Sequence, residues 1–202
     1  RADAADCDVL FVADLDAQPL RPVDAGWLRE LAAVAIRPGT GCVTPARVGR
    51  TDRSPGIGYG ASGGRLHPLL AGQVWPEFSS GSPVSSGSPL ASPRNVLAAG
   101  GCVALSVRLA RALLAAGAEP TPASLSLAAH LEGARNVYWP YSRVRSEGVL
   151  AEVALAEPVD DPYLNPNLRP DQSGLPAIGD GADAKGSGGS PADGSDLPGA
   201  AG

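Results

Sequence analysis

Residues 8–16 read DVLFVADLD, a short apolar run that ends in two carboxylates one residue apart. A continuous apolar run of this length, bounded by acidic residues, predicts a strand buried on both faces within a parallel sheet. After a loop, Trp27, Leu28, Leu31 and Val34 recur at helical spacing and predict one buried helix face, with Asp24 as the N-cap. A second strand is expected over 41–47. Because strands and helices alternate, we expect an α/β fold.

The alternation continues in the second half of the chain. We expect a strand over 99–105, a helix over 106–116 that ends at Gly117, a helix over 123–132 that ends at Gly133, and a strand over 137–139 before Pro140. Between the two halves, residues 50–94 are rich in Gly, Ser and Pro, which predicts mostly loop with a short strand near 57–59. Within it, residues 79–93 (SSGSPVSSGSPLASP) form a low-complexity loop. Residues 171–202 contain almost no large apolar side chains, so we expect a disordered tail.

The composition narrows the functional classes. The formal net charge is −5 and basic residues are scattered, which argues against a nucleic-acid partner. The three cysteines, Cys7, Cys42 and Cys102, are widely spaced and indicate neither a disulfide framework nor a zinc site, so a reducing compartment is expected. No apolar run approaches the roughly 18 residues that a membrane span needs. The sequence contains no Met, so we expect that the natural start is missing.

Five segments, in order, resemble the carboxy-terminal part of the catalytic domain of bacterial family 2 glycosyltransferases of the GT-A type. They are residues 8–45 (DVLFVADLDAQPLRPVDAGWLRELAAVAIRPGTGCVTP), 54–64 (SPGIGYGASGG), 95–108 (NVLAAGGCVALSVR), 131–142 (LEGARNVYWPYS) and 160–168 (DDPYLNPNL). The resemblance implies a partial Rossmann-like nucleotide-diphospho-sugar transferase sheet with flanking helices. It also implies that residues 1–170 form a glycosyltransferase-like domain that lacks its N-terminal nucleotide-binding half.

Asp14 and Asp16 are the candidate metal ligands. Two carboxylates just past a strand can face the crevice at its carboxyl end, where open α/β sheets bind ligands. The resemblance implies that they hold Mn²⁺ or Mg²⁺, which bridges the diphosphate of a nucleotide-sugar donor and stabilises the charge on the departing group. The open alternative is that Asp14 and Asp16 are loop carboxylates that cap a turn.

The resemblance places the family's general base at the start of the helix after residue 120, where this chain has Pro122 and Ser124. Glu119 lies just upstream and is the candidate replacement, because deprotonating a hydroxyl requires a positioned base; alternatively it is an exposed loop residue. Where the family has a histidine near the diphosphate, this chain has Arg143 and Arg145. These arginines either bind the diphosphate by charge-assisted hydrogen bonds or are solvated residues at a strand edge.

Other polar and aromatic residues have weaker expectations. His67 has no evident partner, and we expect His130 to be a packed or partly exposed helix residue. Trp139 and Tyr141 either stack on a sugar ring or pack in the core. Cys102 is expected to be buried. In the last motif, Tyr163, Asn165 and Asn167 are expected to order the chain end against the domain.

The resemblance thus implies a metal-assisted, inverting transfer of a sugar from a nucleotide-diphosphate donor to a hydroxyl of a glycan or lipid-linked acceptor, in cell-surface polysaccharide synthesis. The enzyme would be cytoplasmic, with peripheral association at the inner face of the membrane. Because the expected base is replaced, a catalytically inactive binding or scaffolding domain is the alternative. A truncated product without independent function is the third hypothesis.

Overall fold

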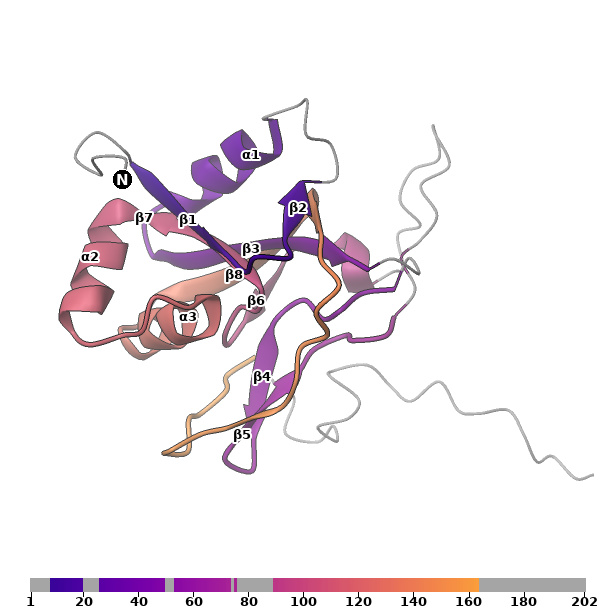
Figure 1. Ribbon diagram of the computed structural model, residues 1–202. Coiled ribbons are helices and arrows are strands. Elements are labelled where there is room, and N and C mark those ends of the chain that lie inside the picture. The colour runs from indigo at the N-terminus through magenta and orange to yellow at the C-terminus, as the bar shows by residue number, and fades with distance from the viewer. Residues whose placement is uncertain (1–7, 20–25, 50–52, 74, 76–88, 164–202) are drawn as a thin grey trace, which may run out of the picture.

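The computed structural model describes residues 8–19, 26–49, 53–73, 75 and 89–163. Asp24, residues 79–88, Asn165, Asn167 and the predicted tail over 171–202 lie outside the described residues. Within the described part, three α-helices and two sheets form a mixed α/β fold, as predicted (Figure 1). In this part no helix combines the length and the apolar character needed to cross a bilayer.

The larger sheet is mixed in direction. Its main path runs β1 (Val9–Ala13), β7 (Cys102–Ser106), β3 (Thr40–Val48), β8 (Arg135–Arg145) and β2 (Gln18–Pro19), and β6 (Arg94–Val96) also pairs with β8. The β3–β8 pair is parallel, whereas the β1–β7, β3–β7, β2–β8 and β6–β8 pairs are antiparallel.

The prediction that β1 lies in a parallel sheet is therefore wrong for the described pairing. β1 runs antiparallel to β7, with Val9 opposite Ser106 and Ala13 opposite Cys102. Its apolar run has another cause. Val9 and Phe11 pack in the cluster under α1 (Gly26–Ala35), and Leu10 and Val12 pack in the cluster under α2 (Val107–Ala115) and α3 (Pro122–Leu131). Helices on both faces require apolar residues on both faces, whatever the direction of the neighbouring strand.

The three helices form as the sequence indicates. In α1, Leu31 and Val34 are buried, and Trp27 meets Phe11 edge-to-face with ring centroids 5.4 Å apart. Leu28, predicted on the same face, is instead 39% exposed. Gly117 (φ 94°) and Gly133 (φ 81°) end α2 and α3 in the left-handed conformation expected of glycine there.

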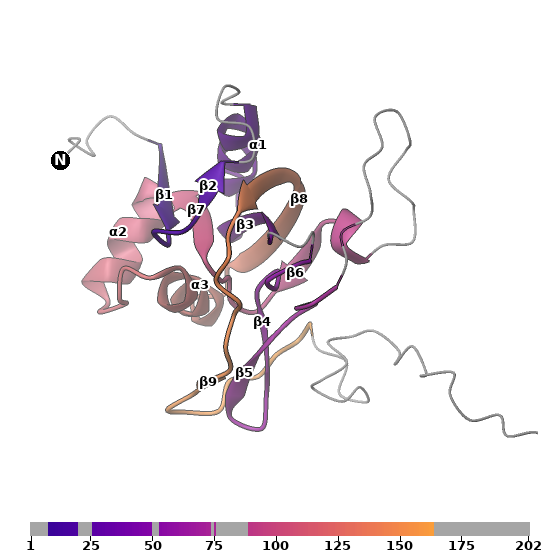
Figure 2. The same cartoon turned by 45° about the vertical axis from the view of Figure 1, so that its right-hand side comes forward.

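A small second sheet occupies part of the region predicted to be mostly loop. It contains β4 (Tyr59–Ser62), β5 (Arg65–Pro68) and β9 (Val153–Ala154), which Figure 2 shows side by side. Gly63 (φ 57°) and Gly64 (φ 73°) join β4 and β5 with the two positive φ angles of a type I′ turn. The Gly-Gly pair was the sequence signal for this hairpin. A short 3₁₀ helix, η1 (Pro89–Ala91), falls in the predicted low-complexity loop.

β8 is longer than the predicted strand over 137–139 and continues past Pro140. Pro45 pairs with Trp139, but the next residue, Ala46, pairs with Arg143. Residues 140–142 therefore bulge out of the β3–β8 ladder, and a proline is tolerated at such a bulge because its nitrogen donates no ladder hydrogen bond. The extension matters because it carries the chain to residues 146–148, beside the end of β1.

Candidate functional site

Asp14 and Asp16 lie on a turn directly after β1. The backbone N–H of Asp14 donates to the carbonyl of Gly101 (2.7 Å), and the N–H of Ala17 donates to the carbonyl of Asp14 (3.0 Å). The Asp14 side chain is exposed, whereas that of Asp16 is half-buried. The two carboxylates thus lie just past the carboxyl end of β1, the strand at one edge of the described sheet, but they differ in exposure.

Asp16 caps the segment that follows β8. Its Oδ2 accepts hydrogen bonds from the Ser146 hydroxyl (2.9 Å) and from the backbone N–H groups of Glu147 (2.9 Å) and Gly148 (2.8 Å). The short β2–β8 pairing, which sets Gln18 opposite Arg145, brings the two segments together. All three bonds fall on one carboxylate oxygen, so the orientation of Asp16 is fixed by residues about 130 positions away in sequence.

These contacts lower the pKa of Asp16. The largest cause is the hydrogen bond from the Gly148 N–H. The pKa is lowered further by the Ser146 hydroxyl, the Glu147 N–H and the Arg47 charge, whereas burial raises it. The pKa of Asp14 is shifted the other way, upward. Burial is the largest cause there, the Arg47 charge opposes it, and the charge of Asp16 adds to it. The pair therefore combines one carboxylate whose charge is stabilised by three hydrogen-bond donors, Asp16, with one whose charge is less favoured, Asp14.

A buried arginine lies behind the carboxylates. Arg47, on β3, is 1% exposed, and its Nη2 donates to the Ser146 hydroxyl oxygen (2.5 Å) and to the Gly148 carbonyl (2.7 Å). The Ser146 hydroxyl accepts from Arg47 and donates to Asp16, so it links the two charges. Sequence reasoning missed Arg47. The available signal was a single charged residue inside an otherwise apolar and small-residue strand.

Asp14 and Asp16 are too few to hold a divalent cation without further ligands. In the described part of the chain no group of three or more His, Cys, Asp or Glu side chains could hold a metal ion. Asp14 and Asp16 supply two hard carboxylates, and Mg²⁺ is commonly bound by one or two carboxylates together with substrate phosphates. A divalent cation at Asp14 and Asp16 would therefore need further ligands, such as the oxygens of a diphosphate.

The other predicted site residues lie elsewhere. The Arg143 guanidinium sits over the Trp75 ring, 5.5 Å from its centroid, and its charge acts on Tyr138. Arg145 is exposed at the end of β8. Glu119 is exposed in the α2–α3 loop, where its N–H donates to the Ser124 hydroxyl (3.0 Å) and its carbonyl accepts from the N–H of Thr121 (2.8 Å). The described contacts of Glu119 thus belong to its own loop and the start of α3.

The aromatic and chain-end residues have structural contacts. Trp139 and Tyr141 meet edge-to-face at 5.1 Å, and Tyr141 is 58% exposed. Tyr163 packs edge-on to half-buried His130 of α3, with ring centroids 6.0 Å apart. Asp161 accepts from the N–H groups of Ala61 (2.8 Å) and Tyr163 (2.9 Å). These contacts order residues 161–163 against the hairpin and α3, as predicted for Tyr163.

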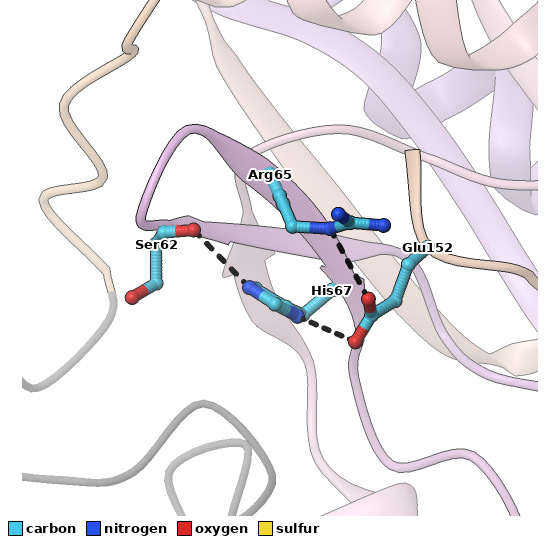
Figure 3. A network of polar contacts seen from close by, with 4 residues as sticks. All are labelled: Ser62, Arg65, His67 and Glu152. Carbon is cyan, nitrogen blue, oxygen red and sulfur yellow. Dashed lines mark hydrogen bonds and ion pairs between the residues drawn. The ribbon is translucent and has the colours of Figure 1, made fainter. Parts of the chain in front are cut away.

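His67 has partners, contrary to the sequence expectation. Figure 3 shows its ring between the carbonyl of Ser62, which contacts Nε2 (3.1 Å), and Glu152, whose carboxylate contacts Nδ1 (3.0 Å). Arg65 pairs with the other oxygen of Glu152 at 3.3 Å. This cluster joins the β4–β5 hairpin to the residue before β9. Because Glu152 and Arg65 are half-exposed, we assign the cluster a modest structural role.

The contacts of Asp16 predict a pH-dependent contribution to stability. A carboxyl whose folded-state pKa is below its ordinary value of 3.8 stabilises the fold above that value and loses the effect as pH falls through the folded-state value. Asp16→Asn should therefore lower the thermal midpoint by a few degrees near neutral pH. Below pH 3.8 the difference from the wild type should shrink toward zero. Thermal unfolding followed across pH tests this, with Asp8→Asn, an exposed residue before β1, as the control. A constant difference at every pH would contradict it.

No protein-family model matches this chain, and comparisons with curated proteins and with solved structures give no significant match. The resemblance to family 2 glycosyltransferases therefore stays a prediction from the sequence.

Proposed function

We propose that Asp14 and Asp16 form the metal and diphosphate part of a donor site in a GT-A-type glycosyltransferase domain. The observation that carries the proposal is the joint placement of the two carboxylates beyond the end of β1, with Asp16 fixed by three hydrogen bonds to residues 146–148. A turn-capping carboxylate explains Asp16 Oδ2 alone. The proposal adds a role for Asp14, the second and exposed carboxylate on the same turn.

The charges suit a metal–diphosphate complex. Asp14 and Asp16 together with Arg47 combine two negative charges and one positive charge in a small volume. A divalent cation held there supplies charge neutralisation for a departing nucleoside diphosphate. The contribution of the chain itself is preorganisation. Asp16 cannot swing away from its position without breaking three hydrogen bonds, so little reorganisation is required when the donor binds.

We propose that residues outside the described part of the chain complete the donor site. In the described part of the chain, β1 pairs with β7 on one edge only, although helices cover both of its faces. A strand that is apolar on both faces is typical of a sheet interior, and an open edge accepts further strands. The proposal therefore includes nucleotide-binding strands beyond β1, as the resemblance implies.

A catalytically inactive binding domain is the second candidate, and the start of α3 favours it. Pro122 is buried at the first helical turn, and the Ser124 hydroxyl accepts from the N–H of Glu119. Both positions where the family has carboxylates thus serve to begin a helix. Glu119 is exposed, and its described contacts lie in its own loop and at the start of α3, so they do not place it as a base beside Asp14 and Asp16.

Turnover separates the two candidates. With Mn²⁺ and UDP- or dTDP-sugars, a transferase should release nucleoside diphosphate, at a rate that falls roughly 100-fold or more in Asp16→Asn because its metal ligand is lost. Glu119→Gln should slow release as well if Glu119 is the base. Binding of the nucleotide without release, unchanged by Glu119→Gln, would favour the non-catalytic domain. Neither binding nor release from a cooperatively folded chain would contradict both candidates.

The location is part of the same proposal. We propose that the domain acts in the cytoplasm, at the inner face of the membrane that holds a lipid-linked acceptor. Co-sedimentation with anionic vesicles tests the peripheral association, and full recovery in the supernatant would argue for a soluble glycan acceptor instead.

A further inference from the structure

Arg47 is enclosed by backbone on two sides. A Cβ built on Gly101 would fall 2.5 Å from Nε and 2.6 Å from Cζ of Arg47, so the guanidinium lies directly against this glycine. On the other side, a Cβ on Gly148 would lie 3.3 Å from Asp16 Oδ2 and 3.8 Å from Arg47 Nη2. One glycine and one hydroxyl, that of Ser146, therefore separate the buried positive charge from the candidate metal ligand.

Hydrogen bonds alone do not offset the free-energy cost of burying the Arg47 charge. Nη2 makes two of them, but Nε and Nη1 are buried and have no hydrogen-bond partner in the described part of the chain. Removing a guanidinium from water is costly unless nearby charges compensate. The compensating charges here are those of Asp14 and Asp16, whose pKa values Arg47 pulls downward. The guanidinium thus acts on the site through its field as well as through the Ser146 hydroxyl.

A positive charge fixed behind two carboxylates discriminates between ligands by their net charge. It repels a bare divalent cation that approaches Asp14 and Asp16. It attracts the complex of that cation with a nucleoside diphosphate, whose net charge is negative. Low dielectric around a buried group strengthens both effects.

We propose that Arg47 is a selectivity-determining residue that makes metal and diphosphate bind together: it weakens binding of the free cation and strengthens binding of the metal–diphosphate complex. This inference rests on the proposed function, because it assumes that Asp14 and Asp16 hold the cation. It goes further by assigning the coupling between metal and diphosphate binding to the buried Arg47.

Two arginine variants test the sign of the effect. Free manganese is measured by its electron paramagnetic resonance signal, and UDP binding at saturating manganese is measured by calorimetry. Arg47→Met should tighten binding of manganese alone by on the order of tenfold and weaken binding of UDP with manganese by a similar factor. Arg47→Lys, which keeps the charge but loses the planar fork, should change both far less. If the role of Arg47 were purely structural, Arg47→Met would weaken the binding of both ligands, and that result would overturn the inference.

A measurement on the wild type keeps the inference testable if Arg47→Met does not fold. UDP should strengthen manganese binding at least about tenfold, since binding of the two ligands is thermodynamically coupled and reciprocal. Equal affinity for manganese with and without UDP would overturn the role of Arg47 while leaving the donor site in place. If the wild type binds neither manganese nor UDP, the proposed function fails and the inference fails with it.

Discussion

Asn136→Ala is expected to lower the free energy of unfolding by roughly 3 to 5 kcal/mol. Asn136 is fully buried at the second position of β8. Its Oδ1 accepts from the N–H of Cys42 (2.8 Å), and its Nδ2 donates to the carbonyls of Leu97 (2.7 Å) and Ser126 (2.7 Å). One side chain thus joins β3, the segment after β6 and helix α3.

The size of the effect follows from what the truncation leaves behind. Three buried backbone groups lose their partners, and each unsatisfied group costs about 1–3 kcal/mol before the structure relaxes. Urea unfolding of the variant and the wild type measures the difference. Asn95→Ala, in which an exposed asparagine of β6 is truncated, is the matched control and should stay within about 0.5 kcal/mol. A loss at Asn136 no larger than at Asn95 would show that these bonds do not hold the elements together.

Gly101→Ala should cost roughly 3 kcal/mol and should also disrupt the site. Gly101 has φ +80°, and its new Cβ would overlap the Arg47 guanidinium, which is 1% exposed and has little room to withdraw. The displaced arginine would release the Gly148 carbonyl and the Ser146 hydroxyl. Asp16 would then lose the fixed geometry of residues 146–148, so binding of manganese with UDP should fall along with stability.

Gly133→Ala is a close control for this prediction. Gly133 has nearly the same φ, +81°, but no atom lies within 4 Å of the position its Cβ would take. It should carry only the cost of the left-handed conformation, about 1–2 kcal/mol, and leave ligand binding unchanged. Urea unfolding and calorimetry on both variants separate the two contributions. Equal effects at the two glycines would mean that Arg47 moves aside freely.

Local signals explain which parts of the fold could be predicted. The β1 run, the positions of α2 and α3 and the glycines at their ends follow from patterns a few residues long. The direction of β1 could not be predicted in this way, because an apolar run reports burial on two faces and not the direction of a neighbour. The β4–β5 hairpin was missed although Gly63-Gly64 marks its turn, since the surrounding glycines and prolines masked the strand pattern.

The candidate site was only half visible in the sequence for a similar reason. Asp14 and Asp16 form a compact motif and could be identified together. Ser146 lies 99 positions from Arg47 and 130 positions from Asp16 in the sequence, and the β3–β8 pairing and the β2–β8 contact bring the three together. Arg143 and Arg145, chosen for their nearness to the expected motif, lie past the β8 bulge opposite Ala46 and Val48, and the Arg143 guanidinium packs over Trp75. The arginine behind the carboxylates lies instead on the neighbouring strand.

The most direct test of the donor-site assignment is calorimetric titration of the folded wild-type chain with UDP in the presence and absence of manganese. The proposed site predicts that UDP binds only when manganese is present. This binding should be abolished in the Asp14→Asn, Asp16→Asn double variant and unchanged in Asp8→Asn. Binding that survives in the double variant, or no binding by a cooperatively folded wild type, would contradict a metal–diphosphate site at Asp14 and Asp16.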